Sequence, residues 1–155
     1  MEKKKKISPK INTLDEARPI IIDICTKTLK KKPKKIFVYG SFANPNKKIT
    51  NTSDIDITVI FPKVRKKYYR LLFPTEIDAV KLKWKLEKEL GRKVDLVIKY
   101  PKKKYSPQEY TQEHRFMENV LLEGAYDIIN NQYYWDTNLY YELFYEMKPI
   151  YKLLG

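Results

Sequence analysis

The stretch "VYGSFANPNKKITNTSDIDITVIF", residues 38–61, constrains the fold of this chain more than any other segment. Runs rich in β-branched and aromatic residues predict two buried strands, one over 35–40 and one over 54–61. The first run stops at a Gly-Ser turn, and the second begins with Asp54 and Asp56. Asp is unfavourable in strands, and two carboxylates on one face repel each other. The arrangement therefore indicates that a cation binds there.

The spacing of the acidic residues predicts where their side chains point. Side chains alternate across a strand, so Asp54 and Asp56 should share one face, about 6.5 Å apart along the backbone. Ile55 and Ile57 should then point into the core. A third apolar run, "KVDLVI", carries one acidic residue, Asp95. If this strand lies beside the second one, the three carboxylates share a cleft.

A cleft with three carboxylates suits hard divalent cations, above all Mg²⁺, because these ions prefer oxygen ligands. Two such ions about 3.5–4 Å apart can hold the attacking and leaving oxygens of a phosphoryl or nucleotidyl transfer. Gly40 allows the backbone to turn sharply and to approach a ligand closely. Ser41 is expected to open a helical turn whose N–H groups favour a phosphate. The sequence therefore predicts a site for metal and triphosphate.

Helices are predicted on both sides of these strands. A first helix should begin near residues 12–13, with Pro19 delaying its regular part by a turn. Residues 63–74 are predicted to form a basic loop, and a long helix is predicted over 106–131, with a break near Gly124. The tyrosine-rich end of the chain predicts one more short helix.

The clearest helical pattern is "TEIDAVKLKWKLEKELG". Thr75 is predicted to be the N-cap, Asp78 stands at the capping-box position, and Gly91 should end the helix. Its buried stripe is predicted to consist of the neighbouring leucines together with Ile77, Val80 and Trp84.

These elements predict a mixed α/β (α+β) fold, in which a small mixed β-sheet is flanked by helices. The short connection between the first two strands favours an antiparallel pair, and the helix before the third strand permits a crossover. The domain organisation is expected to be a flexible basic tail over 1–12, one domain over 13–130, and a C-terminal helical extension over 131–155 packed on the same domain.

Charge is unevenly distributed along the chain. The formal net charge is +13, yet residues 109–155 contain eight acidic and three basic residues, which leaves +18 on the first 108 residues. This asymmetry favours an anionic partner for the N-terminal part. Nucleotides or non-specifically bound nucleic acid are the leading candidates. The alternative is that the lysines only solvate the surface.

Several classes of protein are disfavoured by the composition. No stretch approaches the roughly 20 apolar residues that a membrane-spanning helix needs, and no apolar segment follows the basic start as in a signal peptide. The single Cys25 cannot form an internal disulfide, and its apolar surroundings predict a buried, inert thiol. A cytoplasmic (intracellular) location without a membrane partner is expected.

The quoted motifs resemble one known superfamily. "YGSFA", then twelve residues between Ser41 and Asp54, then "DID", and later "LGRKVDLVI", are similar to the motifs of DNA polymerase beta-like nucleotidyltransferases. The chain looks most like their minimal nucleotidyltransferase (MNT) group, and "FMENVLLEGAYDII" is similar to that group's closing helix. The resemblance covers about residues 13–130.

The resemblance implies a role for each motif residue. Gly40 and Ser41 would hold the triphosphate of an NTP. Asp54 and Asp56 would bind two ions, Mg²⁺ or Mn²⁺, and Asp95 would bind one of them and help to activate an acceptor hydroxyl. Many members continue the Gly-Ser turn with arginines.

This chain instead has Phe42, Asn44 and Pro45 after the Gly-Ser turn. Lys47 or Lys48 would then have to replace the phosphate contacts of the family's arginines. This departure concerns nucleotide affinity more than chemistry.

The activity implied is transfer of a nucleoside monophosphate, AMP from ATP, to a hydroxyl acceptor. Small members of the group often act as antitoxins that modify a partner protein of the HEPN type, and the brevity of this chain favours that subtype. One alternative is an enzyme that extends a nucleic-acid end, which the basic half would serve. Another is a non-catalytic nucleic-acid-binding module, against which the retention of all three aspartates counts.

Overall fold

The computed structural model of the chain describes residues 11–44, 47–62, 64–99, 108 and 124–134. The helices, 3₁₀ turns (η) and strands follow in the order α1 (Leu14–Thr28), β1 (Lys35–Tyr39), η2 (Gly40–Phe42), β2 (Ile55–Ile60), η3 (Lys66–Tyr68), α2 (Tyr69–Leu72), α3 (Glu76–Leu90), β3 (Val94–Lys99), β4 (Ala125–Asp127) and β5 (Gln132–Tyr134).

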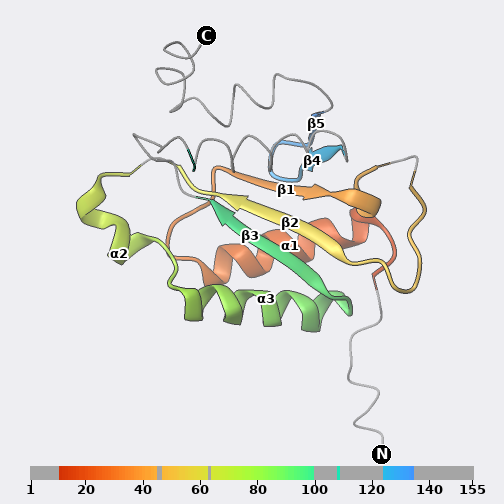
Figure 1. Cartoon of the computed structure of the whole chain (residues 1–155), viewed down its shortest axis with the longest axis horizontal. Coiled ribbons are helices and arrows are strands. Elements are labelled where there is room, and N and C mark those ends of the chain that lie inside the picture. The colour runs from red at the N-terminus through yellow and green to blue at the C-terminus, as the bar shows by residue number, and fades with distance from the viewer. Residues whose placement is uncertain (1–10, 45–46, 63, 100–107, 109–123, 135–155) are drawn as a thin grey trace, which may run out of the picture.

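The strands form one mixed sheet in the order β3-β2-β1-β4-β5 (Figure 1). The adjacent strands β1 and β2 pair antiparallel, as their short connection predicts, and β1 also pairs antiparallel with β4. Helix α3 carries the chain from β2 to β3, and these two strands are parallel. The predicted mixed sheet with helices is therefore confirmed.

Helix α1 begins where the sequence predicts. The hydroxyl oxygen of Thr13 accepts a hydrogen bond from the backbone N–H of Glu16 at 3.1 Å, so Thr13 is the N-cap. Pro19 lies inside the helix, which is regular from Leu14 onward. The predicted delay by one turn is therefore wrong: the helix accommodates the proline after its first turn.

Helix α3 has the predicted start and end. The Thr75 hydroxyl accepts from the backbone N–H of Asp78, and the Asp78 carboxylate accepts from the backbone N–H of Thr75, so the capping box is complete. Gly91 ends the helix in the left-handed region, with φ 65°, where glycine has no steric penalty.

The predicted buried stripe of α3 is confirmed for its leucines and wrong for Ile77, Val80 and Trp84. The buried side chains are Leu82, Leu86 and Leu90, whereas exposed fractions of 68%, 44% and 65% are found for Ile77, Val80 and Trp84. The helix carries two apolar stripes with helical spacing. The sheet packs against the stripe of leucines. The stripe of Ile77, Val80 and Trp84 faces away from the core.

This assignment predicts a large difference between two truncations in α3. Leu86→Ala should lower the free energy of unfolding by about 2–5 kcal/mol, because it leaves a cavity in the core. The matched change Trp84→Ala, at an exposed position, should alter it by less than about 0.5 kcal/mol. Urea denaturation of both variants measures the difference. If Trp84→Ala lowers the free energy of unfolding by more than this, the face of α3 that carries Trp84 is buried against another part of the protein.

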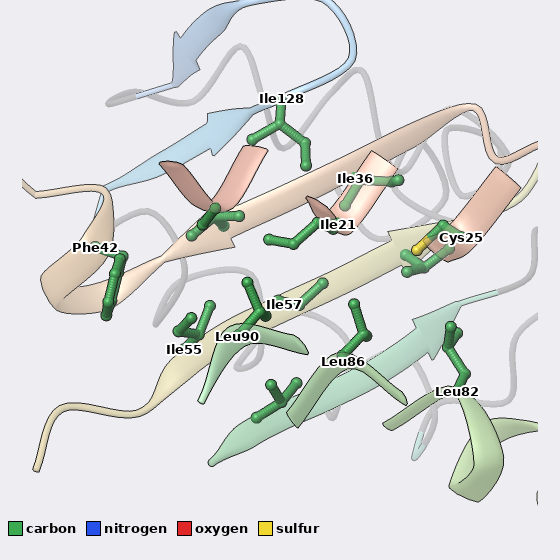
Figure 2. Close-up of a cluster of buried hydrophobic side chains, with 14 of the residues drawn as sticks. Ile21, Cys25, Ile36, Phe42, Ile55, Ile57, Leu82, Leu86, Leu90 and Ile128 are labelled. Atoms are coloured by element: carbon green, nitrogen blue, oxygen red, sulfur yellow. The ribbon is translucent and has the colours of Figure 1, made fainter. Parts of the chain in front are cut away.

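The core lies between the sheet and the two long helices, which cover the same face of the sheet (Figures 1 and 2). Helix α1 contributes Ala17, Ile21 and Cys25, which are fully or almost fully buried. Burial raises the pKa of the Cys25 thiol to about 12, which keeps it protonated and inert, as predicted. The strands contribute alternate residues, among them Ile36, Val38, Ile55, Ile57, Val59 and Val94.

Two helical predictions near the C-terminus differ from the structure. After Gly124, which has φ 79°, the segment predicted to continue a helix forms β4, and β5 stands at the start of the predicted C-terminal extension. Pairing with β1 overrides the local helical preference there. The remainder of the predicted 106–131 helix and of the 131–155 extension, together with most of the 1–12 tail, lies outside the described residues, apart from residue 108, which is helical.

The basic stretch predicted to be a loop, residues 63–74, contains the short helices η3 and α2 where it is described. Within the described part of the chain, no helix is both long enough and apolar enough to cross a membrane.

Candidate active site

Three polar side chains form a row across the sheet, on the face away from α1 and α3. Tyr39 of β1 is the register partner of Asp56 of β2, and Asp56 is the register partner of Asp95 of β3. Paired strands lie about 4.8 Å apart, so neighbours in this row are close. The strand-pairing prediction for Asp95 is therefore confirmed by the register.

Exposure increases along this row toward the edge strand. Tyr39 and Asp56 are half-buried, and Asp95 is exposed. Asp54 is also exposed and precedes β2 by one residue, rather than lying inside the strand. The isoleucines that alternate with the acidic residues, Ile55 and Ile57, are fully buried in the core as predicted.

The β1–β4 side of the same face is closed by buried side chains. Phe37 is 1% exposed, and the Lys35 ammonium lies 3.6 Å from the Asp127 carboxylate in a buried ion pair. The Asp127 carboxylate also accepts from the backbone N–H of Ile129 and from the Asn130 side chain. Asp56 thus stands at the border between a closed region of the face and the exposed edge at Asp95.

The Gly40 backbone lies directly against Asp56. Gly40 has φ 78°, and a Cβ atom added to it would stand 2.5 Å from Oδ2 of Asp56. Only glycine adopts this conformation without strain, and only the absence of a side chain leaves room for the carboxylate. Glycine at this position therefore lets the turn after β1 approach Asp56 closely.

The other residues predicted to bind nucleotide lie around this turn. Ser41 is half-buried in η2, whose end is closed by hydrogen bonds from the N–H groups of Ala43 and Asn44 to the Gly40 carbonyl at 3.0 and 2.9 Å. Lys47 and Lys48 are exposed. The charge of Lys47 acts on Asp56, so at least one of the two lysines is near the carboxylates.

Electrostatics at the row favour a bound cation. Burial, and then the charges of Asp95 and Asp54, raise the pKa of Asp56 to about 6, while Lys47 acts in the opposite direction. Among the described residues, no group of three or more His, Cys, Asp or Glu side chains is placed so that it could hold a metal ion. The donor set nevertheless fits Mg²⁺ or Mn²⁺, since it consists of carboxylate oxygens whose repulsion a cation relieves.

The raised pKa of Asp56 predicts how the stability of the metal-free protein depends on pH. The folded state takes up the proton near pH 6, whereas the unfolded chain takes it up near pH 3.8. Between these values the folded state binds more protons, so stability falls as pH rises through about 4 to 6. Asp56→Asn removes the titrating carboxyl group, so the variant should not lose this stability as the pH rises.

Because Asp56 is only half-buried, water screens part of the effect. Asp56→Asn should therefore melt higher than wild type by about 2–4 °C at pH 7.5, which corresponds to roughly 1 kcal/mol in a chain of this size. At pH 4 the two proteins should have the same melting temperature. Thermal unfolding in EDTA at both pH values tests this, and equal melting temperatures at pH 7.5 would contradict it.

Two residues near the site have no role in the sequence-based prediction. Tyr39 flanks Asp56 on the side opposite Asp95, and its hydroxyl accepts a 3.4 Å hydrogen bond from Thr58. Strand alternation alone does not reveal this position, because it depends on the register between two strands. Arg92 places its guanidinium over the ring of Phe42, and its contacts lie far away in sequence.

Comparison with known proteins identifies the family of the chain. Residues 18–117 match the family model described as a nucleotidyltransferase domain. A relative in Methanocaldococcus jannaschii, named "Putative protein adenylyltransferase MJ0435", is 30% identical over 101 residues, which cover 65% of this chain and 85% of the relative.

Two solved structures show weaker similarity. The tri-AMPylated Shewanella oneidensis HEPN toxin in complex with MNT antitoxin is 22% identical, with a TM-score of 0.49 and coverage of 90% of this chain and 87% of that one. A mutant of the toxin–antitoxin pair MntA–HpeT is 17% identical, with a TM-score of 0.49 and coverage of 88% and 97%. The family match spans most of the chain and includes every residue of the row, so the chain belongs to the nucleotidyltransferase domain family.

Proposed function

We propose that this chain is a metal-dependent protein adenylyltransferase, which transfers AMP from ATP to a hydroxyl group of a partner protein. The observation that carries the reaction type is the row across the sheet, where Asp56 and Asp95 are register partners and the Gly40 backbone packs against Asp56. The choice of AMP and of a protein acceptor is supported by the relative that is named an adenylyltransferase.

Each residue has a distinct task in this proposal. Asp54 and Asp56 hold the divalent ions, Mg²⁺ or Mn²⁺, and Asp95 contributes to one of them. When bound, two such ions neutralise the triphosphate and stabilise the attacking and leaving oxygens. The Gly40–Ser41 turn holds the phosphates, because its backbone is close to Asp56 and the Ser41 hydroxyl can donate a hydrogen bond.

The chemistry is an in-line displacement at the α-phosphorus. The acceptor hydroxyl oxygen forms a bond to this phosphorus, the bond to the pyrophosphate oxygen breaks, and pyrophosphate leaves. The hydroxyl proton passes to the carboxylate of Asp95, which is exposed on the edge strand and therefore accessible to a large acceptor. Lys47 and Lys48 balance phosphate charge.

The acceptor that we propose is a HEPN-type partner, on the basis of the resemblance of the motifs to the minimal nucleotidyltransferase group. The domain that performs this reaction is proposed to cover residues 13–130, with a basic tail before it and an extension after it. Non-specific binding of nucleic acid by the basic N-terminal half remains a separate proposal, which rests on charge alone.

Incubation with each α-³²P-labelled NTP and Mg²⁺, alone and with cell lysate, tests the proposal. Label from ATP should appear on a protein, and Asp56→Asn should abolish it. Label on nucleic acid would favour the end-extending alternative. Absence of label on any molecule, with wild-type protein and lysate from the cells of origin, would contradict the proposed activity.

The close approach of Gly40 to Asp56 predicts a loss of activity in Gly40→Ala. The added Cβ atom forces Asp56 to move, and a displacement of about 1 Å costs roughly 10²-fold in rate. The positive φ adds about 1–2 kcal/mol of strain.

Gly91→Ala is the matched control, because Gly91 also has positive φ but caps α3. It should lose similar stability and keep full transfer activity. Transfer rates and urea denaturation of both variants provide the measurement. A wild-type transfer rate in Gly40→Ala would show that the contact with Asp56 is unimportant.

A further inference from the structure

Arg92 is a buried charged residue that connects distant parts of the chain to the site. It lies in the turn between α3 and β3 and is 5% exposed. Its Nη1 donates hydrogen bonds to the backbone carbonyls of Thr50 and Ser53, both at 2.8 Å. The carbon of its guanidinium lies 5.0 Å from the centre of the Phe42 ring.

The other side of the same guanidinium contacts the start of α1. Nη2 donates to the side-chain oxygen of Asn12 at 2.9 Å, and Nε donates to the backbone carbonyl of Ile11. The partners of Arg92 thus come from segments 39 to 81 residues away in sequence. All of these acceptors are uncharged oxygens, so the interaction orients backbone rather than neutralising a carboxylate.

Two of the contacts are next to residues of the site. Ser53 directly precedes Asp54, and Phe42 directly follows Ser41. The loop before β2 also has its own turn, in which the Ser53 N–H donates to the Thr50 carbonyl at 3.2 Å and the Thr50 N–H donates to the Ser53 hydroxyl at 2.8 Å. Arg92 binds both carbonyls of this preformed turn.

We propose that Arg92 is a positioning residue, which holds the Thr50–Ser53 turn and the Phe42 ring in a fixed relative arrangement and thereby fixes the positions of the neighbouring residues Asp54 and Ser41 relative to Asp56. The proposal rests on the proposed function for its kinetic part only. Arginine suits this task because its planar guanidinium presents five donors in a rigid fork, which a lysine ammonium does not reproduce.

The decisive variant is Arg92→Lys, which keeps the positive charge and removes the planar set of guanidinium donors. In the metal-free protein, the hydrogen-bonded backbone amides of Thr50 and Ser53 should exchange with deuterium at least about tenfold faster than in wild type, because Arg92 no longer holds the carbonyls of their turn. At a temperature where the variant is folded, kcat for AMP transfer should fall about 10–100-fold, as expected for a displaced catalytic group. The Mg²⁺ concentration for half-maximal rate should also rise several-fold.

Two matched variants separate positioning from general stability. Asn12→Ala removes one acceptor of Arg92 on the α1 side, and Arg70→Lys changes an exposed arginine of α2. Both should keep wild-type kcat, wild-type Mg²⁺ dependence and wild-type exchange rates at the amides of Thr50 and Ser53. A role in stability alone predicts that Asn12→Ala and Arg92→Lys lower the melting temperature with kcat unchanged.

If Arg92→Lys does not fold, Phe42→Leu provides the test, because it removes the aromatic partner of the guanidinium and keeps an apolar side chain. It should speed exchange at the amides of Ala43 and Asn44 and lower kcat. Wild-type exchange and wild-type kcat in the folded variant would overturn the proposal. The exchange measurement needs no substrate. It therefore tests the positioning role of Arg92 even if the wild-type protein transfers no nucleotide.

Discussion

Asp56→Asn is expected to reduce nucleotidyl transfer by on the order of 10³-fold or more, which corresponds to about 4 kcal/mol of transition-state stabilisation. Asn keeps the size of the side chain and removes one negative charge from the ligands of both proposed ions. Asp56 is central in the row, between Tyr39 and Asp95 and against Gly40. No other described carboxylate has this position, so none can replace it.

The measurement is the rate of AMP transfer at saturating ATP over a range of Mg²⁺ concentrations. Asp54→Asn should show a loss of the same kind, since the two side chains share the metal-binding task. The matched control is Asp23→Asn on α1, where the carboxylate is exposed and pairs with Lys27 at 3.1 Å. It should transfer like wild type. Wild-type rates and wild-type metal affinity in Asp56→Asn would falsify the assignment of the activity to this row.

Asp95→Asn is expected to separate binding from chemistry. Its proposed task is to accept the proton of the acceptor hydroxyl, and loss of a general base costs about 10²–10⁴-fold in rate. Asp95 is exposed on the edge strand β3, on the far side of Asp56 from Tyr39. ATP affinity should therefore stay within about threefold of wild type, because Asp54 and Asp56 retain the ions.

Equilibrium binding of a fluorescent ATP analogue with Mg²⁺, measured beside the transfer rate, tests this separation. The Asp56→Asn protein is the reference, because it should lose binding and transfer together. If Asp95→Asn loses ATP binding as severely as Asp56→Asn, its main role is that of a metal ligand. If it transfers at the wild-type rate, the proton is accepted elsewhere.

Local sequence was sufficient for the strands β1, β2 and β3 and for the direction of the side chains around Asp56. Period-two alternation at residues 54–57 predicts which side chains enter the core and which face the site, and Ile55 and Ile57 are fully buried accordingly. A glycine before the Ser41 turn is required by backbone sterics, which act within a few residues. The capping box of α3 is local for the same reason. Such features depend on covalent geometry and on hydrogen bonds between near neighbours, so a single sequence reveals them.

The register between strands was only partly accessible from the sequence. The sequence predicts that Asp95 joins Asp56 if the third strand lies beside the second, and the β2–β3 pairing meets this condition. Tyr39 belongs to the same row, but its place depends on which residues of β1 and β2 face each other. A shift by one residue would move it to the other face of the sheet. Pairing across the whole sheet decides between these registers.

Tertiary packing alone decided three other features. Helix α3 has two apolar stripes. The stripe of Leu82, Leu86 and Leu90 packs in the core, and Trp84 in the other stripe is exposed. Segment 125–127 is a strand because β1 supplies its hydrogen-bond partners. Arg92 is buried because carbonyls far away in sequence accept its donors. In each case the free energy comes from partners that the chain brings close only when it folds, so no pattern within the segment carries the information.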